Sequence, residues 1–438
     1  MSNFIKINNK INNFNKTIIV PGDKSLSIRW VLFSSMALGN SKALNLLLSD
    51  DVLAAIKTVK KFGINVKLNK KSCTIYGNGL YGYNYKKNVI INAENSGTLG
   101  RLIMGILIDT PYKIKIIGDK SLSRRDFYRV AEPLTKFGAK INLTKNGLPL
   151  TIEGNKNLSP IRYLEHRGSA QCKSSVIFAG LKTRGKTFIK AKKSRNHTEL
   201  LCKHLNLPIK VNKTKNYDLI EVSKTKKIKP LNYKIPSDIS SAAFFIVLTA
   251  LSDNSELLIK NVNINPSRIG IITILKKMGV NIKFKNKKKY KGETIANIFV
   301  NSSKKLKAIN CPKKFNSLAI DEFLVIFLIA AKSNGISYFK DISELNKKES
   351  PRLKWASKIL NKIGIKTIST ESSIKIFGNP NLRVNKKIEI KGYLKDHRVF
   401  MTSVIAALAF GGTWYIHDKD SIKTSFPTFL SIIKNLSK

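Results

Sequence analysis

One pattern of polar and apolar positions recurs along the chain. A basic residue, an apolar residue and a glycine are followed by alternating apolar and polar residues. The copies are KKFGINV (60–66), TKFGAKI (135–141), KKMGVNI (276–282), NKIGIKT (361–367) and a degenerate one, CKHLNLPIKV (202–211). Basic side chains suit the negative end of a helix dipole, glycine suits the left-handed position after the last turn, and the alternation begins a strand. Each copy therefore predicts the end of a helix and the start of a strand.

The spacing of these glycines predicts six similar units. Gly63, Gly138, Gly279 and Gly364 are separated by 75, 141 and 85 residues, and the middle gap is about two periods. Six units of about 73 residues would fill the chain, and each is larger than a solenoid repeat. The last unit ends on the helix-like segment SFPTFLSIIKNL without a following strand. We expect the opening segment, FIKINN…TIIV, to supply that strand and so to join both termini in one domain.

Apolar segments predict the helices of these units. Each begins with polar or small residues and becomes apolar, at 25–38, 96–108, 169–181, 240–251, 322–331 and 352–363. The longest apolar runs, Ala242–Leu251 and Phe323–Ala331, are far shorter than the ~20 residues of a membrane span. The first residues lack the apolar core of a signal peptide. We expect a cytoplasmic protein of two or three domains that binds no membrane.

The charge balance leaves two interpretations open. The chain has 438 residues, of which 79 are Lys or Arg and 27 are Asp or Glu, for a formal net charge of +52. A basic nucleic-acid-binding protein would use this charge to neutralise phosphates. However, the lysines are spread along the whole chain, and the runs at 224–229 and 285–291 contain few aromatic residues. Such runs are typical of solvated loops, so we favour anionic small-molecule substrates and expect no specific nucleic acid.

Cysteine and histidine predict neither a disulfide framework nor a metal site. The four cysteines, at 73, 172, 202 and 311, and the five histidines show no metal-ligand spacing. We expect four buried or unreactive thiols, no cofactor and no metal.

Groups that can bind anions recur at predicted helix starts. The stretches are PGDKSLSIR (21–29), ENSGTLGR (94–101), GDKSLSRRDF (118–127), GSAQCKSS (168–175) and PSDISSAAFF (236–245). The free backbone N–H groups and the positive end of a helix can bind phosphate or carboxylate there. One hydroxyl-capped helix start is weak support. Several at equivalent places of a repeat, most followed by arginine or lysine, favour a shared site for an anionic ligand.

Arginine and the scarce carboxylates sharpen this hypothesis. In a lysine-rich chain, a retained arginine suggests a need for its planar fork, which holds a carboxylate or phosphate by two parallel bonds. The candidates are Arg29, Arg101, Arg125, Arg195, Arg352 and Arg398. Asp321 and Glu322 begin an apolar helix, and Glu349 lies between Lys348 and Arg352. Helix-dipole capping and surface ion pairs are the alternatives. An acid–base pair within a cationic site is the functional interpretation.

These stretches occur in the order found in one enzyme family. The additional segments are SRNHTE (194–199), NPSRIG (265–270), DEF (321–323), KKESPRL (347–353), DHR (396–398) and TSFPTF (424–429). From about residue 20 to residue 430 the chain resembles the 5-enolpyruvylshikimate-3-phosphate synthase family. Eleven ordered motifs make the resemblance specific, whereas any single motif would not.

The resemblance implies an α/β fold with two domains, an inside-out α/β barrel of six βαβαββ repeats with three repeats in each domain and the helices buried. The implied N-terminal lobe is 23–235. The implied C-terminal lobe is 1–22 together with 236–438, closed by the N-terminal strand. The chain would cross between the lobes near 20–23 and 234–237, with the active site in the cleft between them. We expect a monomer.

The implied reaction joins shikimate 3-phosphate to phosphoenolpyruvate through a tetrahedral ketal and releases phosphate. By motif position, the catalytic residues are Asp321 for the 5-hydroxyl proton, Glu349 for the methylene carbon, and Lys24. The implied ligands of shikimate 3-phosphate are Lys24, Ser25, Arg29, Ser169, Ala170, Gln171, Arg195, Asp321 and Lys348. The implied ligands of phosphoenolpyruvate are Lys24, Asn95, Gly97, Arg125, Gln171, Arg352 and Arg398.

Some positions depart from the family pattern. Pro351 and Asn196 each replace a common aspartate, and Thr424 stands where some members have a lysine, with Lys423 one residue earlier. Pro351 as the first helical residue would keep Arg352 in place. UDP-N-acetylglucosamine enolpyruvyl transferase, which shares the fold and chemistry, is the closest alternative. It typically carries a reactive cysteine in a glycine-rich loop, and residues 118–127 contain none.

Overall fold

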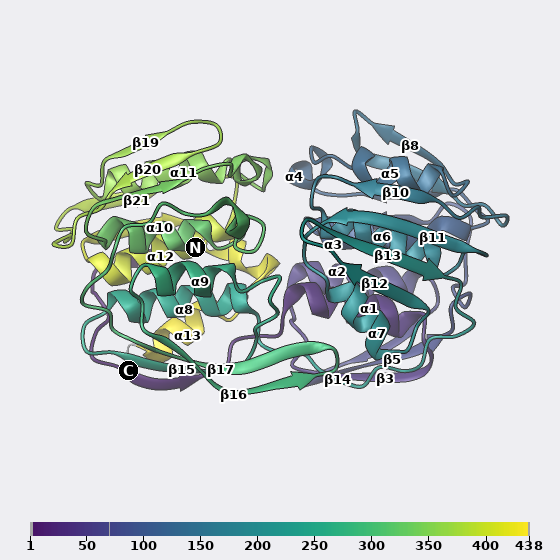
Figure 1. The fold of residues 1–438 in the computed structure, drawn as a ribbon, viewed down its shortest axis with the longest axis horizontal. Helices are drawn as coiled ribbons and strands as arrows, with labels where there is room; N and C mark the ends of the chain where they lie inside the picture. Colours follow the sequence, from purple (N-terminus) through teal and green to yellow (C-terminus); the bar gives the residue numbers. More distant parts are fainter. Residues whose placement is uncertain (1–2, 70, 437–438) are drawn as a thin grey trace. The chain divides into compact units, whose positions relative to one another are not determined.

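The computed structural model describes residues 3–69 and 71–436, which divide into two compact units (Figure 1). One unit, here the N-terminal lobe, comprises Gly22–Ile235 and Lys289–Glu293. The other, the C-terminal lobe, comprises the described residues up to Pro21, Pro236–Lys288, and those from Thr294 onward. Each lobe has its own core of buried apolar side chains. Within the described chain, no helix is both long enough and apolar enough to cross a bilayer.

Among the described residues, the strands of the N-terminal lobe form three four-stranded sheets. The first is β14 (Tyr233–Lys234), β3 (Leu38–Leu44), β5 (Ser72–Asn78) and β4 (Asn65–Leu68); the second is β6 (Ile90–Asn92), β7 (Ile114–Ile117), β9 (Gly147–Glu153) and β8 (Lys140–Thr144); the third is β10 (Arg162–Glu165), β11 (Lys186–Lys192), β13 (Tyr217–Ser223) and β12 (Ile209–Lys213). In every sheet the first pair is parallel and the other two pairs are antiparallel. The three sheets are therefore copies of one topology.

The helices of this lobe fill its interior. They are α1 (Lys24–Ser35), α2 (Asp50–Lys61), α3 (Gly97–Ile106), η1 (Leu107–Asp109), α4 (Lys120–Ser123), α5 (Tyr128–Thr135), α6 (Ala170–Gly180) and α7 (His197–His204). Nearly all residues of α1, α3 and α6 are buried. Helices α3 and α6 approach closely at Gly105, where a Cβ would lie 2.1 Å from the carbonyl oxygen of Ser175. This packing fixes the starts of α3 and α6 relative to each other.

The C-terminal lobe repeats this plan with variations. Its sheets are β2 (Asn15–Ile18), β15 (Glu256–Asn263), β17 (Glu293–Asn301) and β16 (Ile282–Tyr290); β18 (Ile336–Phe339), β20 (Ile374–Phe377) and β19 (Thr367–Ser369); and β1 (Phe4–Ile7), β22 (Thr413–His417) and β21 (Lys387–Ile390). In the second sheet, single parallel bridges from Lys307 and Asn310 to residues 334 and 338 take the place of a fourth strand. In the third, β1 pairs antiparallel with β22.

Three helices of this lobe, α8 (Ile239–Leu251), α10 (Phe323–Lys332) and α12 (His397–Phe410), form its centre. The other described helices of the lobe are α9 (Gly270–Lys277), η2 (Lys313–Phe315), η3 (Ser343–Lys347), α11 (Arg352–Lys362), η4 (Lys419–Thr424) and α13 (Phe429–Leu436). Every residue of α8 and α12 is buried, and α8, α10 and α12 pack against one another. Their starts carry the polar groups of the candidate site.

The predicted repeat is confirmed. One complete βαβαββ copy runs β6, α3, β7, α5, β8, β9. Gly63, Gly138, Gly279 and Gly364 have φ of 80°, 109°, 89° and 87°, as helix-ending glycines should. The opening segment supplies a strand to the last repeat, because β1 pairs with β22.

The structure places two chain segments differently from the predicted lobe boundaries. Gly22 belongs to the N-terminal lobe, and so do residues 289–293, which were predicted in the C-terminal lobe. For residues 289–293 the physical reason lies in contacts of the turn between β16 and β17. The ring of Tyr290 stacks on that of Tyr233 at 5.5 Å, and Lys291 Nζ donates to the carbonyl oxygen of Asn232.

Candidate active site

The predicted site residues fall into one group in each lobe. In the N-terminal lobe, Asp23 begins α1 by accepting a hydrogen bond from the backbone N–H of Leu26 at 3.0 Å. This cap makes Lys24 the first helical residue. Its ammonium group lies 2.9 Å from the carboxylate of Asp51 on α2. An anionic substrate at this helix start would compete with Asp51 for Lys24.

Arg29 lies one turn further along α1, in a socket made by three helices. Its Nε donates to Thr198 Oγ1 at 2.8 Å, Nη2 donates to Ser174 Oγ at 3.0 Å, and Nη1 donates to the carbonyl oxygen of Ser25 at 3.1 Å. Burial lowers the pKa of Arg29 to about 10, with a smaller contribution from the positive charge of Arg195. The guanidinium therefore stays charged at neutral pH and is held rigidly.

Two guanidinium groups flank the start of α3. Ser96 caps this helix by accepting from the N–H of Leu99, and Arg125 Nη2 donates to Asn95 Oδ1 at 2.8 Å. A Cβ on Gly97 would lie 3.3 Å from Nη1 of Arg125 and 3.4 Å from Nη1 of Arg101. Glycine thus lets both cations approach a helix N-terminus, a combination suited to a carboxylate or phosphate.

Helix α6 joins these two clusters. Ser169 caps it by accepting from the N–H of Cys172 at 3.3 Å, and Ala170 is its first residue. Gln171 accepts from Arg101 Nη1 at 2.5 Å and donates to Thr98 Oγ1 at 3.0 Å. Burial, aided by the nearby charge of Arg129, lowers the pKa of Arg101 to about 10. Since Ser174 of the same helix holds Arg29, the N-terminal lobe carries one continuous polar cluster.

In the C-terminal lobe, Arg352 is surrounded by carboxylates. Its Nε donates to Asp396 Oδ2 at 2.9 Å, and Nη2 donates to Glu349 Oε2 at 2.5 Å. Its Nη1 lies 3.6 Å from Asp321 Oδ1. Burial alone would lower the pKa of Arg352, but attraction to Asp396, Glu349 and Asp321 outweighs burial and raises it above its usual range. Arg352 is therefore a fixed positive charge.

Both predicted proton-transfer groups touch this cation. Asp321 lies just before α10 and also accepts from Lys348 Nζ at 3.2 Å, while Glu349 precedes α11. The side chains of Asp321 and Glu349 are 18% and 16% exposed, so both reach solvent. A partly exposed carboxylate beside fixed cations can exchange a proton with a ligand.

Arg398 is the second residue of α12 (His397–Phe410). Asp396 caps the helix through the N–H of Arg398 at 2.9 Å, and Arg398 Nη1 donates to the carbonyl oxygen of Ser240 at 3.3 Å. Ser240 also contacts Arg268 and Glu322, neither of which is among the predicted ligands or catalytic residues. Arg268 Nη2 donates to Ser240 Oγ at 2.6 Å, and Ser240 Oγ donates to buried Glu322. The quoted segments NPSRIG and DEF contain both residues, so the retained-arginine criterion, applied to NPSRIG as well, would have found Arg268.

The departures from the family pattern have distinct local settings. Pro351 stands one residue before α11, at the cap rather than at the predicted first helical position, and its carbonyl still accepts from the N–H of Trp355 at 3.1 Å. Asn196 precedes α7 in the same way. Thr424 Oγ1 lies 3.2 Å from His397 Nδ1, and Lys423 pairs with Asp420 at 2.9 Å. Arg352 is thus the first residue of α11.

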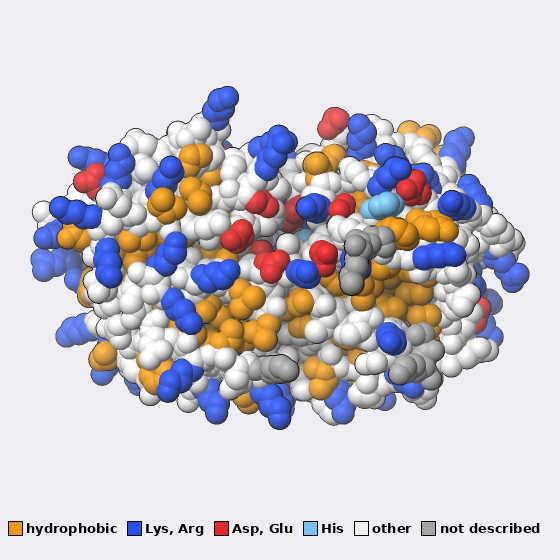
Figure 2. Space-filling view, turned by 180° about the vertical axis from the view of Figure 1, so that it is seen from behind, with side chains coloured by type: hydrophobic (Ala, Val, Ile, Leu, Met, Phe, Trp, Pro, Cys, Tyr) orange, Lys and Arg blue, Asp and Glu red, His pale blue; other side chains and the backbone are white. Residues whose placement is uncertain are grey.

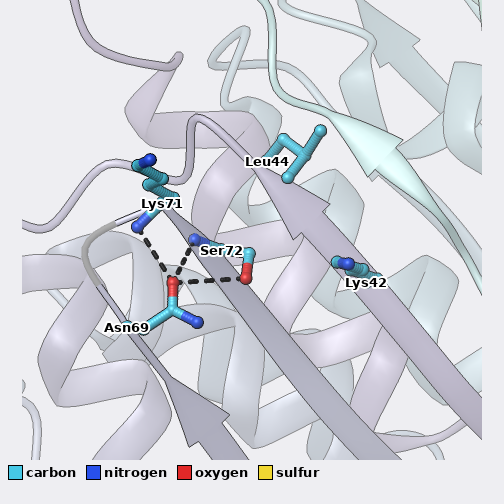
Figure 3. Close-up of a pocket in the computed structure, with 5 residues that line it drawn as sticks. All are labelled: Lys42, Leu44, Asn69, Lys71 and Ser72. Carbon is cyan, nitrogen blue, oxygen red and sulfur yellow. Dashed lines mark hydrogen bonds between the residues drawn. The ribbon is translucent and has the colours of Figure 1, made fainter.

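One surface pocket of the N-terminal lobe contains none of the predicted site residues. A pocket of about 560 Å³ on the first sheet is lined by Lys42, Leu44, Asn69, Lys71 and Ser72, where Asn69 Oδ1 accepts from the N–H groups of the last two (Figure 3). Within residues 3–69 and 71–436, no three His, Cys, Asp or Glu side chains are grouped so as to hold a metal ion.

Comparison with known proteins decides the family. The profile of the family described as EPSP synthase (3-phosphoshikimate 1-carboxyvinyltransferase) matches residues 8–433. The chain belongs to the EPSP synthase family. A 3-phosphoshikimate 1-carboxyvinyltransferase of Ruthia magnifica subsp. Calyptogena magnifica is 39% identical over 426 residues, covering 97% of this chain and 96% of the relative. The Caldicellulosiruptor bescii enzyme of that name is 37% identical over 427 residues, covering 97% of each.

Solved structures agree with this EPSP synthase assignment. A structure of EPSP synthase from Acinetobacter baumannii superposes with a TM-score of 0.87 at 33% identity, covering 100% of this chain and 98% of that one. The enolpyruvyl transferase NikO from Streptomyces tendae gives 0.77 at 14% identity, covering 99% and 97%. The second likeness supports the two-domain enolpyruvyl transferase fold alone.

Proposed function

We propose that the protein is a 3-phosphoshikimate 1-carboxyvinyltransferase that transfers the enolpyruvyl group of phosphoenolpyruvate to the 5-hydroxyl of shikimate 3-phosphate. The observation that carries the proposal is the family match over residues 8–433. The chemistry of the described residues supports it. Both substrates carry a phosphate and a carboxylate, and each lobe holds arginines fixed at helix starts.

Shikimate 3-phosphate is assigned to the Arg29 side of the N-terminal lobe. Ser25, Ser169 and Ala170 lie at or next to the starts of α1 and α6, where backbone N–H groups and hydroxyls suit a phosphate. Arg29 and Arg195 supply positive charge, and Lys348 and Asp321 contribute from the C-terminal lobe. Gln171 and Lys24 complete the proposed set.

Phosphoenolpyruvate is assigned to the cations around Gly97 and to the arginines of the C-terminal lobe. Arg125 and Asn95 are already hydrogen-bonded to each other, which orders both before a ligand arrives. In the C-terminal lobe, Arg352 and Arg398 supply the cations. That residues of both lobes serve one pair of substrates is part of the proposal.

The reaction proceeds by addition and elimination. The 5-hydroxyl oxygen attacks C2 of the enol and gives its proton to Asp321, while C3 receives a proton through Glu349. The resulting ketal then loses a proton from C3, the double bond reforms, and the C2–O bond to phosphate breaks. Lys24, Arg125 and Arg352 stabilise the charge on the departing phosphate, since fixed cations act where charge develops.

A cytoplasmic monomer without a specific nucleic-acid partner completes the proposal. Figure 2 shows lysine and arginine side chains scattered over the face drawn, with no single continuous patch. Nucleic-acid binding usually gathers such charge on one face. Light scattering of the purified protein tests the monomer directly.

The deciding experiment measures phosphate release from shikimate 3-phosphate and phosphoenolpyruvate. We expect turnover by the unmodified protein, and a loss in kcat of about 10²-fold or more in Asp321→Asn or Glu349→Gln, because general acid–base groups contribute on this scale. Asp253→Asn is the matched control, since this carboxylate is exposed and lies 4.0 Å from Lys10. Its kcat should be unchanged.

Two outcomes would contradict the proposed activity, and a third would contradict the role of Asp321. Phosphate release with UDP-N-acetylglucosamine as acceptor, but none with shikimate 3-phosphate, would support the sister enzyme. Absence of release with either acceptor, together with salt-dependent RNA binding, would support a nucleic-acid-binding protein. Full turnover in Asp321→Asn would show that the role of that residue is misassigned.

A further inference from the structure

The first three residues of α7 tie this helix to three other segments of the N-terminal lobe. His197 binds Glu293, Thr198 binds Arg29 and Ser174, and Glu199 pairs with Lys173. We infer that Glu293 is a positioning residue for shikimate 3-phosphate: through His197 it fixes the start of α7 and, with it, the socket of Arg29. This inference rests on the proposed function, in which Arg29 binds that substrate.

The contact between Glu293 and His197 is wholly buried. His197 Nδ1 and Glu293 Oε1 are 2.7 Å apart, and both side chains have 0% exposure. The other ring nitrogen, Nε2, is buried and has no hydrogen-bond partner among residues 3–69 and 71–436. Among the described residues, Glu293 therefore makes the hydrogen bond that orients this imidazole. Removing a buried hydrogen-bond partner leaves a polar group unsatisfied, so the local structure must shift.

Such a shift would reach Arg29 directly. Thr198 follows His197 in the chain, and its hydroxyl lies 2.7 Å from Ser174 Oγ and accepts from Arg29 Nε at 2.8 Å. Two of the three protein contacts of Arg29 described above thus run through the interface of α6 and α7. A guanidinium binds a phosphate well only while its fork is aimed correctly, so a small displacement lowers affinity.

The opposite flank of the socket is held independently. Lys173 Nζ and Glu199 Oε1 form an ion pair of 2.6 Å, with side chains 0% and 3% exposed. This pair joins α6 to α7 next to the contact between Ser174 and Thr198. Loss of Glu293 should therefore loosen one side of the socket without unfolding it. A local effect on shikimate 3-phosphate is expected, rather than a general loss of structure.

The test compares steady-state constants of Glu293→Ala with those of the unmodified enzyme. We expect the KM for shikimate 3-phosphate, and its Kd in direct titration, to rise at least tenfold. The KM for phosphoenolpyruvate and kcat should stay within threefold. Glu371→Ala, which makes the same chemical change at an exposed position of the C-terminal lobe, is the control and should change neither KM. A rise of both KM values together with a fall in kcat would mark a general defect and overturn the inference.

A double-mutant cycle tests the route through Arg29. In an Arg29→Ala background, Glu293→Ala should change the Kd for shikimate 3-phosphate by less than about twofold, because coupled residues are not additive. A full tenfold effect there would overturn the inference. Glu293→Gln, which can still accept from His197, should stay within threefold of the unmodified enzyme. If Glu293→Ala does not fold, Glu293→Gln and His197→Gln are compared instead. An equal Kd for shikimate 3-phosphate in these two variants would count against the inference. An inactive unmodified protein would instead reject the proposed function.

Discussion

At the scale of single residues, arginine carried most of the predictable information. Arg29, Arg101, Arg352 and Arg398 were singled out because a lysine-rich chain retains them, and all four are buried and hydrogen-bonded within the first two turns of a helix. Their partners could not be predicted, because Thr198 and Ser174 come from helices far away in the sequence. Arg268 was missed although it is equally buried. Its partners, Asp238 and Ser240, also lie in another segment.

Gly97 gives the first prediction at this scale. A methyl group there would press on the guanidinium groups of Arg125 and Arg101, at 3.3 and 3.4 Å. We expect Gly97→Ala to displace both cations and raise the KM for phosphoenolpyruvate about tenfold, equivalent to about 1.4 kcal/mol. The KM for shikimate 3-phosphate should stay within threefold, because the Arg29 socket is not touched. Initial-rate kinetics with each substrate varied in turn measure both.

The neighbouring residue supplies the control for Gly97. Thr98→Ser keeps the hydroxyl that accepts from Gln171 and should leave both KM values within about twofold. An unchanged KM for phosphoenolpyruvate in Gly97→Ala would show that this substrate does not approach the start of α3.

At the scale of elements, local sequence predicted helix boundaries closely: the six predicted helix starts lie within one residue of the observed starts, and the predicted ends lie within three residues. Each of the four glycines of the repeated pattern has positive φ, and β4, β8, β16 and β19 begin two or three residues later. This worked because a left-handed glycine and an alternating strand are local properties. The short helix α4 was not predicted, since four residues are too few for a periodic pattern.

Two of these glycines give a paired prediction. At Gly364 a Cβ would meet no atom within 4 Å. Gly364→Ala should therefore lower the free energy of unfolding only by the strain of a positive φ, about 1 kcal/mol. At Gly279 the Cβ would also lie 2.6 Å from the carbonyl oxygen of Lys305. We expect Gly279→Ala to lower the free energy of unfolding by about 2 kcal/mol more than Gly364→Ala does. Both lie in the C-terminal lobe, so the shift of the same urea-unfolding transition compares them. Equal shifts would show that the contact with Lys305 relaxes freely.

At the scale of the whole molecule, the number and topology of the repeats followed from the sequence, but the exchange of segments did not. The period of the glycine pattern predicted six units, and the strand order of the sheets agrees with it. The short strand β14 pairs with β3, almost 200 residues away, and no local pattern marks it. Residues 289–293 are a second segment whose place the local sequence does not mark. Their lysines predicted a solvated loop, whereas Tyr290 and Glu293 contact residues of the N-terminal lobe. Pairings of this kind depend on tertiary contacts.

The cysteines give a prediction for the folded molecule as a whole. All four lie buried, three in the core of the N-terminal lobe and Cys311 in that of the C-terminal lobe, and burial raises the pKa of every one of these thiols. The pKa rises to about 12 for Cys73 and about 11 for Cys311, so almost no thiolate exists at pH 8. Because the thiolate is the reacting form, we expect less than one thiol per chain to react with an aromatic disulfide reagent in an hour, against four in guanidinium chloride. Rapid labelling of one native cysteine, located by mass spectrometry, would contradict this burial. It would also point to the reactive cysteine that the sister enzyme typically carries.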